Sequence, residues 1–308
     1  MSSFSRRAGM SRTPGRRARL GYGSPMRSAF ITGAATGIGE ALVVRLQREG
    51  WQVFAAYRNS PPDRTRWFGM PNVIAVPCDV TDPDQVVAAA STVGEHTGGA
   101  LDLLINNAGY SPREGVIEAA SMTEYRRAFE VNFWGPVQVV QAMTPLLRPS
   151  KGRIINTTSG SVYMTIPMAS AYPTSKAALK TFTQHLRMEL APFGIEVTNL
   201  EPGGVDTAMT ETGPEAGAQQ WALIPEPLRE QYRRHFLDGA TAIGDNFTFE
   251  HPDAFADAVW KRIISAKRLR PSYLIGPKVA VLPWLHRLLP AQQVENIWRR
   301  MFSRKPGA

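Results

Sequence analysis

The residues of this sequence best suited to proton transfer are Tyr172 and Lys176, four positions apart, with Ser159 thirteen positions before the tyrosine. Residues at this spacing share one face of a helix, so a phenol would lie beside an ammonium group. A tyrosine with its ordinary pKa of about 10 is a poor base at neutral pH, but a cation within ~4–6 Å stabilises the phenolate and lowers that pKa. We therefore interpret Tyr172 as an acid/base and Ser159 as the group that orients a substrate oxygen. The same spacing is common on amphipathic helices, so the surrounding elements have to support this interpretation.

The hydrophobic pattern around these residues alternates between short strands and amphipathic helices. Apolar segments typical of strands begin at residues 28, 52, 73, 101, 152 and 195, and helical spacing of apolar residues follows at 38–50, 85–93, 121–147 and 172–192. Such alternation predicts a parallel sheet with helices on both faces. No internal linker marks a second domain. The sequence therefore predicts one doubly wound α/β domain, in which ligands bind beyond the carboxyl ends of the strands.

A glycine-rich turn follows the first predicted strand. The segment TGAATGIG carries three glycines between this strand and the next helix. Glycine lets the backbone approach a ligand closely, and the free N–H groups at a helix start favour a pyrophosphate. We expect a dinucleotide to contact Gly33, Thr36, Gly37, Ile38 and Gly39. The alternative is a tight strand-to-helix turn without a ligand.

The end of the second strand indicates which dinucleotide binds. Residues 50–62 contain no acidic residue and offer Arg58, where an NAD site would normally place a carboxylate. A guanidinium complements a 2′-phosphate, so we expect NADP, with NAD as the weaker candidate. Asp79 and Val80 would hold the adenine. The alternatives are that Arg58 begins a solvated loop and that Asp79 caps a helix, although Asp82 is better placed for that role.

Two further strand ends carry small and polar residues. The segment NNAG at 106–109 can hold its strand in register while leaving room for a flat ring, although a simple turn would also use asparagine and glycine. The segment PGGVDT at 202–207 ends the sixth predicted strand. In a parallel sheet these ends meet in one crevice with the glycine-rich turn.

Together these segments resemble the short-chain dehydrogenase/reductase family. The matching motifs, in order, are Thr32-Gly33-x3-Gly37-x-Gly39, Asp79, Asn106-Asn107-Ala108-Gly109, Asn132, Ser159, Tyr172-x3-Lys176 and Pro202-Gly203-x-Val205-x-Thr207. The resemblance covers residues 27–210. It implies a Rossmann-like fold with a seven-stranded parallel sheet in a single domain, assembled as a homodimer or homotetramer.

The resemblance also implies a reaction and a set of roles. The reaction is hydride transfer between a nicotinamide and a carbonyl or alcohol carbon, with Tyr172 moving the proton. Asn132, Ser159, Tyr172 and Lys176 would form a catalytic tetrad, in which Asn132 bends its helix and positions a water that links Lys176 to bulk solvent. The implied cofactor contacts, with those derived above, are Gly33, Thr36, Gly37, Ile38, Gly39, Arg58, Asp79, Val80, Asn106, Ala108, Gly109, Tyr172, Lys176, Pro202, Gly203, Val205 and Thr207.

The segments beyond residue 207 would determine the substrate. Residues 207–250 are typical of a mobile lid, and residues 271–303 predict an apolar helical extension. This tail resembles the hydroxysteroid and retinol dehydrogenase branch of the family, which implies a lipophilic alcohol or ketone. Its apolar stripe consists of Val281, Leu282, Leu285, Leu288 and Leu289, and suits a packed core, a subunit interface or shallow membrane contact.

The positive charge of the chain is concentrated at its N-terminus. The 308 residues carry a net charge of +9, and seven arginines without any acidic residue lie in the first 27 positions, which leaves +2 for the rest. We expect residues 1–26 to form a disordered basic extension and residues 27–308 to form the domain. The nearly neutral body argues against nucleic acid as the partner.

Other classes of site are disfavoured by composition. Cys78 is the single cysteine, which fits a reducing, cytoplasmic setting. The five histidines lack ligand spacing, so we expect no metal site. The apolar segment 273–290 is interrupted by charges, glycine and prolines, so we expect no transmembrane span.

Three alternatives stay open at this point. A non-catalytic dinucleotide-binding sensor or partner-binding protein would be expected to have a broken tetrad. A nucleic-acid-binding protein would lose salt-dependent affinity when residues 1–26 are deleted. A dehydratase or epimerase of the extended family is disfavoured by the NNAG and Pro-Gly motifs.

Overall fold

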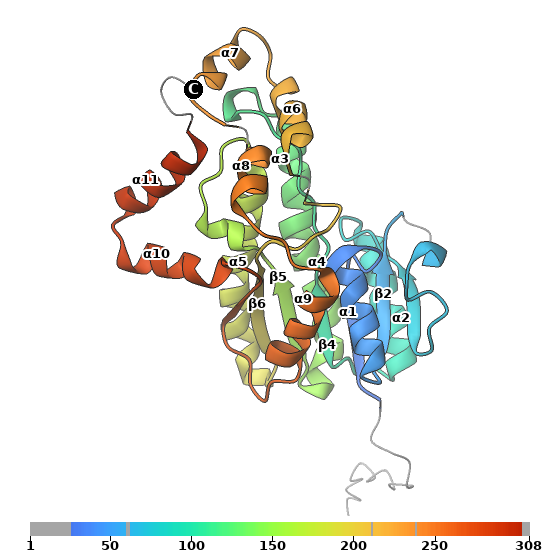
Figure 1. Ribbon diagram of the computed structural model, residues 1–308. Helices are drawn as coiled ribbons and strands as arrows, with labels where there is room; N and C mark the ends of the chain where they lie inside the picture. The colour runs from blue at the N-terminus through green and yellow to red at the C-terminus, as the bar shows by residue number, and fades with distance from the viewer. Residues whose placement is uncertain (1–25, 60–61, 211, 238, 304–308) are drawn as a thin grey trace, which may run out of the picture.

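The computed structural model describes residues 26–59, 62–210, 212–237 and 239–303, and within them the predicted parallel sheet is confirmed. Seven strands pair in the order β3-β2-β1-β4-β5-β6-β7, and every pairing is parallel. The strand order reverses between β1 and β4, which lie side by side at the centre (Figure 1). The strands are β1 Ser28–Ile31, β2 Gln52–Tyr57, β3 Val73–Pro77, β4 Leu103–Asn106, β5 Arg153–Thr157, β6 Glu196–Pro202 and β7 Ser272–Ile275.

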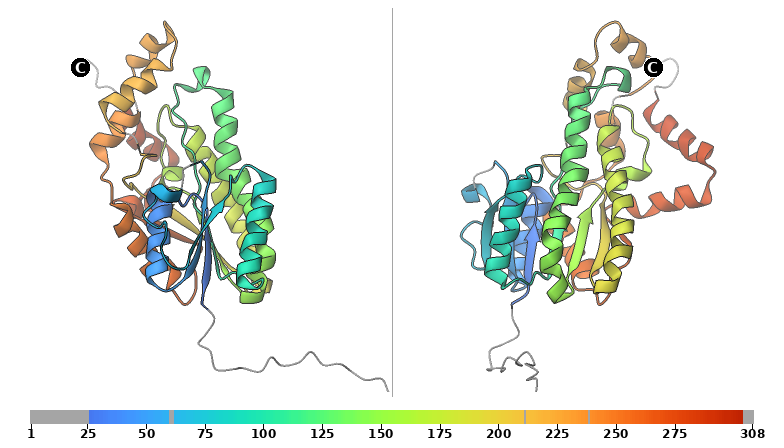
Figure 2. Two further views of the ribbon diagram at one scale, coloured as in Figure 1. Left: turned by 90° about the vertical axis from the view of Figure 1, so that its right-hand side faces the viewer. Right: turned by 180° about the vertical axis from the view of Figure 1, so that it is seen from behind.

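Helices cover both faces of the sheet, as Figure 2 shows. Helices α1 (Gly37–Arg48) and α9 (Pro252–Val259) pack on one face, and α2 (Pro83–Thr97), α4 (Gly135–Ser150) and α5 (Ala171–Leu190) on the other. Successive strand residues point to opposite faces. Ile31 and Ile105 pack in the core under α1 and α9, while Phe30 and Leu104 pack in the core under α2, α4 and α5. Because both faces are buried, the central strands β1, β2 and β4 consist mostly of apolar residues.

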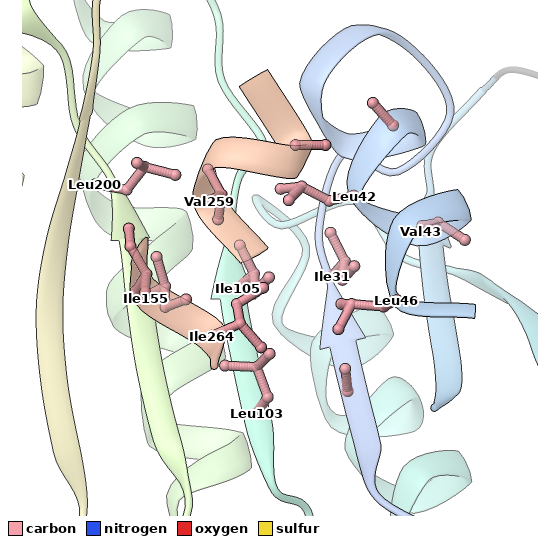
Figure 3. Packing of buried hydrophobic residues seen from close by; sticks show 14 of the residues in the cluster. Ile31, Leu42, Val43, Leu46, Leu103, Ile105, Ile155, Leu200, Val259 and Ile264 are labelled. Atoms are coloured by element: carbon pink, nitrogen blue, oxygen red, sulfur yellow. The ribbon is translucent and has the colours of Figure 1, made fainter. Parts of the chain in front are cut away.

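Figure 3 shows the core between α1, α9 and the sheet. Ile31, Ile105 and Ile155 extend from three strands toward Leu42 of α1 and Val259 of α9, and all are fully buried. Burying each such side chain contributes about 1.5–3 kcal/mol. This packing fixes α1, and therefore the start of α1, against the carboxyl ends of the central strands.

The helix predicted over 121–147 is interrupted by a wider turn. It consists of α3 (Met122–Phe129), a π-helical turn (Glu130–Trp134) and α4, which ends at Ser150. A π turn inserts one extra residue and is frequent at functional sites. Asn132 lies in the middle of this turn. The backbone therefore departs from regular α-helical geometry at the residue that was expected to bend its helix.

Several short helices lie above the carboxyl edge of the sheet. Within the expected lid are α6 (Pro214–Ala222), α7 (Leu228–Arg233) and α8 (Gly239–Asn246), which project upward in Figure 1. The short helical turns elsewhere are Pro62–Arg64, Ile117–Ala119, Gly160–Tyr163, Ala191–Phe193, Trp260–Ile264 and Val279–Val281.

The C-terminal segment is partly strand, whereas the sequence predicted a helical extension from residue 271. Its first part forms β7 at the edge of the sheet, and only then follow α10 (Leu282–Leu288) and α11 (Ala291–Phe302). The predicted stripe divides: Leu282, Leu285 and Leu289 pack in a core with α8 and α11, while Val281 and Leu288 are exposed. Shallow membrane contact through the exposed part stays a prediction.

Two expectations concern segments beyond this core. The basic extension predicted at residues 1–26 lies outside the described residues, apart from Met26. Among the helices that the structure describes, none has the length and apolar character needed to cross a membrane.

Candidate active site

A cavity of about 500 Å³ opens at the carboxyl edge of the sheet and brings most of the predicted site residues together. Its walls come from the turn after β1 and from the segments after β4, β5 and β6, with helix α5 along one side. The predicted residues that line it are Gly33, Thr36, Gly37, Ile38, Ala108, Gly109, Ser159, Tyr172, Lys176, Pro202, Gly203, Val205 and Thr207. Segments separated by more than 170 residues therefore form one site.

The glycine-rich turn needs glycine for two reasons. Gly33 and Gly37 have φ values of 63° and 55°, a region that other residues rarely adopt. A Cβ on Gly33 would also lie 2.8 Å from Cα of Ala108, and one on Gly37 would lie 2.9 Å from Cγ2 of Thr207. The Thr36 side chain does not cap α1, so the first N–H groups of this helix are left available beside the cavity. These features fit a bound pyrophosphate.

Asn107 and Thr32 tie this turn to the end of β4. The Thr32 hydroxyl oxygen accepts hydrogen bonds from the backbone N–H groups of Asn107 at 2.9 Å and Ala108 at 3.0 Å. The Asn107 side chain donates in return to the carbonyls of Thr32 and Gly33. Asn107 was not among the predicted site residues, although the NNAG motif contains it.

Asn106 and Gly39 belong to the scaffold and do not line the cavity. Asn106 is buried, and its amide donates to Oδ1 of Asn156 on the neighbouring strand at 2.8 Å. A side chain on Gly39 would collide with the carbonyl oxygen of Gly33 and the amide of Asn107. Asn106 therefore lies on the face of the sheet that α5 covers, whereas Asn107, one residue beyond the strand, reaches the turn.

Arg58, Asp79 and Val80 also lie outside the cavity lining, at the ends of β2 and β3. The Arg58 guanidinium is 3.9 Å from the Asp79 carboxylate, and 46% of its side chain is exposed. Asp79 accepts hydrogen bonds from the N–H and hydroxyl groups of Thr81. Val80 is buried against Gly135. Asp82, as the sequence favoured, caps α2 by accepting from the second and third N–H groups of the helix.

Tyr172, Lys176 and Ser159 meet at the centre of the cavity. Tyr172 lies in the first turn of α5, and the Lys176 Nζ one turn later is 5.8 Å from the centroid of the tyrosine ring. The Ser159 hydroxyl forms a hydrogen bond with the phenol. The Lys176 ammonium donates to the carbonyl of Thr157 at 2.9 Å, at the end of β5. The i, i+4 spacing thus produces the expected arrangement.

The pKa of Tyr172 is raised above its ordinary value. Burial disfavours the phenolate, and the hydrogen bond from Ser159 opposes this only in part. Burial also lowers the pKa of Lys176 to about 8, since the ammonium has lost most of its water. Residue spacing places the cation beside the phenol, but it does not reveal how deeply the two groups are buried.

Asn132 holds the segment after β4 against α5. It is fully buried, its Oδ1 accepts from the N–H of Tyr110 at 2.8 Å, and its amide donates to the carbonyl of Tyr110 and to Ser175. Asn132 is absent from the cavity lining. A Cβ built on Gly109 would nevertheless lie 3.5 Å from both Oδ1 of Asn132 and Nζ of Lys176, so the two side chains converge beneath this glycine.

Much of the remaining cavity lining is apolar, although Arg113, Glu114 and Gln220 also line it. Its lining beyond the tyrosine includes Met164, Ile166, Met168, Met209, Ile243, Phe247, Phe249 and Leu282. Gly160 also lines the cavity, whereas Val162 and Trp221 do not. A Cβ on Gly160 would collide with Val279, so the C-terminal segment packs directly on the residue after Ser159.

Comparison with known proteins identifies the family. The family model for short chain dehydrogenases matches residues 27–217. The chain belongs to the short chain dehydrogenase family. It is therefore an oxidoreductase, and both the predicted resemblance and the predicted fold are confirmed.

Relatives within this family differ in what their names describe. The chain is 34% identical over 270 residues to the NADPH-dependent 1-acyldihydroxyacetone phosphate reductase of Schizosaccharomyces pombe, with 87% of this chain and 88% of the relative covered. It is 36% identical to the rat estradiol 17-beta-dehydrogenase 2, with 59% of this chain and 49% of that protein covered. A crystal structure of a short chain dehydrogenase from Burkholderia cenocepacia in complex with NADP superposes with a TM-score of 0.68 at 26% identity, covering 89% and 97% of the two chains.

Proposed function

We propose that this protein is an NADP(H)-preferring oxidoreductase that interconverts a lipophilic alcohol and its carbonyl compound, with Tyr172 as the acid/base. The observation that carries the proposal is that Tyr172, Ser159 and Lys176 line the same cavity as the glycine-rich turn. A non-catalytic sensor would have no need for a complete tetrad beside the cofactor site.

Each side chain has a defined task in this reaction. A bound nicotinamide supplies or accepts the hydride at the substrate carbon. In reduction, the Tyr172 hydroxyl donates its proton to the developing alkoxide, and in oxidation the phenolate accepts it. The Ser159 hydroxyl orients the substrate oxygen beside the phenol, and the buried ammonium of Lys176 favours the phenolate electrostatically.

The pKa of Tyr172 is raised and the pKa of Lys176 is lowered, so the charge of the bound cofactor should affect which protonation state Tyr172 adopts. In the oxidative direction a positively charged nicotinamide would favour the phenolate and offset the effect of burial. In the reductive direction a protonated phenol is the required form, so burial assists the proton donor.

The preference for NADP rests on Arg58. Its guanidinium is half exposed, and its single described ionic partner is Asp79 at 3.9 Å, a weak pair at that distance. It can therefore turn toward a 2′-phosphate, which a guanidinium binds in a bidentate manner. The relatives named for NADPH and solved with NADP support the same preference.

A lipophilic substrate is supported by the apolar residues in the cavity lining. Methionine, isoleucine and phenylalanine side chains line the cavity, together with Leu282 from α10. Methionines adapt to irregular apolar ligands. The relatives named for an acyl lipid and a steroid point to the same class. A homodimer or homotetramer in the cytoplasm stays a prediction.

A panel of alcohols and carbonyl compounds, followed by nicotinamide absorbance with NADPH and NADH separately, tests this proposal. Turnover by the native protein should fall at least about 100-fold in Tyr172→Phe, since general acid/base catalysis contributes ~10²–10⁴-fold. Dinucleotide affinity should change much less than turnover in that variant, because the glycine-rich turn and Arg58 are untouched. Equal turnover by Tyr172→Phe would refute the assignment of the acid/base.

A further inference from the structure

The carboxylate of Glu114 lies at the start of α5, the helix that carries Tyr172. Glu114 belongs to the segment after β4, and only 4% of its surface is exposed. Its Oε1 accepts from the N–H of Ala171 at 2.9 Å, and its Oε2 from the N–H of Ser170 at 3.0 Å, the Ser170 hydroxyl at 3.1 Å and the Ala171 N–H at 3.1 Å. The N–H of Tyr172 also contributes a hydrogen bond to this carboxylate.

Helix α5 has no cap within its own sequence. The side chain of Ser170, at the N-cap position, accepts no hydrogen bond from the helix, and the first turn contains no acidic residue. Pro173 has no N–H, so Ala171 and Tyr172 hold the helical N–H groups that would lack a partner. Glu114 accepts from both. An anion at this end of the helix also matches the helix dipole.

The same contact reaches helix α3 through Ser170. The hydroxyl of Tyr125 on α3 forms a hydrogen bond with the Ser170 hydroxyl. The segment after β4, helix α3 and the start of α5 therefore meet at one carboxylate. Glu114 also lines the cavity that contains Tyr172 and Ser159.

We propose that Glu114 is a positioning residue for Tyr172. By capping the N-terminus of α5, it fixes where the phenol lies relative to Ser159. The inference rests on the proposed function of Tyr172 as acid/base. Loss of the carboxylate would free the first turn of α5, in which Tyr172 is the second residue. Displacement of a reacting group by about 1 Å costs up to ~100-fold in rate.

Steady-state kinetics of Glu114→Gln, Glu114→Ala and Glu114→Asp test this role. We expect kcat to fall by about 10- to 100-fold in the first two variants, while the dissociation constant for NADPH changes less than about twofold, because the glycine-rich turn and Arg58 are untouched. Glu114→Asp, which keeps the charge on a shorter side chain, should recover part of the rate. Glu189→Gln removes an exposed carboxylate near the other end of α5 and should leave kcat unchanged.

Two results would overturn the inference. One is a native kcat in Glu114→Ala. The other is a parallel loss of kcat, NADPH affinity and thermal stability, which would indicate a general structural role. If Glu114→Ala does not fold, Ser170→Ala removes a single hydrogen bond from the carboxylate and should lower kcat by about 2- to 5-fold at native NADPH affinity.

Amide hydrogen exchange separates this inference from the proposed function. Exchange at Ala171 and Tyr172 should accelerate in Glu114→Gln and stay native in Glu189→Gln, with the rest of α5 unaffected. Unchanged protection would overturn the inference whatever the substrate. If the native protein reduces or oxidises no compound of the panel, the proposed function is refuted. The hydrogen-exchange result would still show whether Glu114 caps the N-terminus of α5.

Discussion

The buried ammonium of Lys176 donates its hydrogen bond to the backbone carbonyl of Thr157, at 2.9 Å, and lies 5.8 Å from the ring centroid of Tyr172. The carbonyl gives the charge one fixed polar partner, and burial lowers the pKa of Lys176 to about 8 from its ordinary 10.5. The cation is therefore held in place at the expense of stability, since a charge that has lost water destabilises the folded state.

Lys176 should make stability depend on pH in a defined direction. Below pH 8 the lysine is charged in both states, so its burial destabilises the fold. Between about pH 8 and 10.5 the folded form loses its proton first and this penalty declines, so the contribution of Lys176 improves as pH rises. In denaturant unfolding at pH 7, we expect the free energy of unfolding of Lys176→Met to be larger than that of the wild type by on the order of 1–3 kcal/mol.

The advantage of Lys176→Met should shrink when the same unfolding is measured at pH 9.5, while its turnover is lost at both pH values. Lys180→Met serves as a comparison, because Lys180 pairs with the buried Glu201 and its removal should destabilise at both pH values. A pH-independent difference between wild type and Lys176→Met would contradict the assignment of a lowered pKa.

Arg58 should control the choice between dinucleotides. Removing a charge-assisted hydrogen bond to a phosphate loses about 1.5–3 kcal/mol, so Arg58→Ala should weaken NADPH binding about 10- to 100-fold and leave NADH binding nearly unchanged. Fluorescence titration with both nucleotides measures this. Arg64→Ala, in the exposed turn after β2, is the matched control and should affect neither. Equal losses for both nucleotides in Arg58→Ala would contradict the predicted contact.

Gly37 should be required for cofactor binding because of its surroundings as well as its backbone. Gly37→Ala would place a Cβ 2.9 Å from Thr207 at a φ of 55°. Gly50 has a φ of 77° but no atom within 4 Å of such a Cβ, so Gly50→Ala isolates the backbone effect. We expect both to destabilise by roughly 1 kcal/mol, and Gly37→Ala alone to lose dinucleotide affinity. Similar affinity in both variants would argue against the turn as the pyrophosphate site.

Asn132 should matter for stability and catalysis together. Asn132→Ala leaves both backbone groups of Tyr110 without their partner in a buried site, which costs about 1–3 kcal/mol for each unsatisfied group. Ser175→Ala removes one partner of the amide and should cost less. Thermal unfolding and turnover of both variants check this order. A stable Asn132→Ala with native turnover would refute a role for the π turn.

Periodicity and turn chemistry were sufficient to predict the fold. Alternating strands and helices predicted the parallel sheet, and the i, i+4 spacing placed Lys176 one helical turn after Tyr172. These features depend on local geometry, which a sequence encodes directly. The glycine-rich turn was equally accessible, because positive φ values favour glycine at Gly33 and Gly37.

Features that depend on contacts between distant segments could not be predicted. Glu114 lies 56 residues before Ser170, and its sequence neighbourhood resembles an ordinary loop. The distinction between Asn106 and Asn107 depends on which way each strand residue points, and the pKa of Tyr172 depends on how deeply it is buried. The tail likewise required the structure, since β7 pairs with a strand about 70 residues earlier.

The contact between Gly160 and Val279 has a consequence for protein engineering. Because the tail packs against the backbone of the residue after Ser159, it is an integral part of the fold. Shortening the chain to a minimal fold would remove this packing beside Ser159. A chimera that carries this tail on another scaffold would need glycine at the position of Gly160, because a larger side chain there would prevent the tail from packing against the domain.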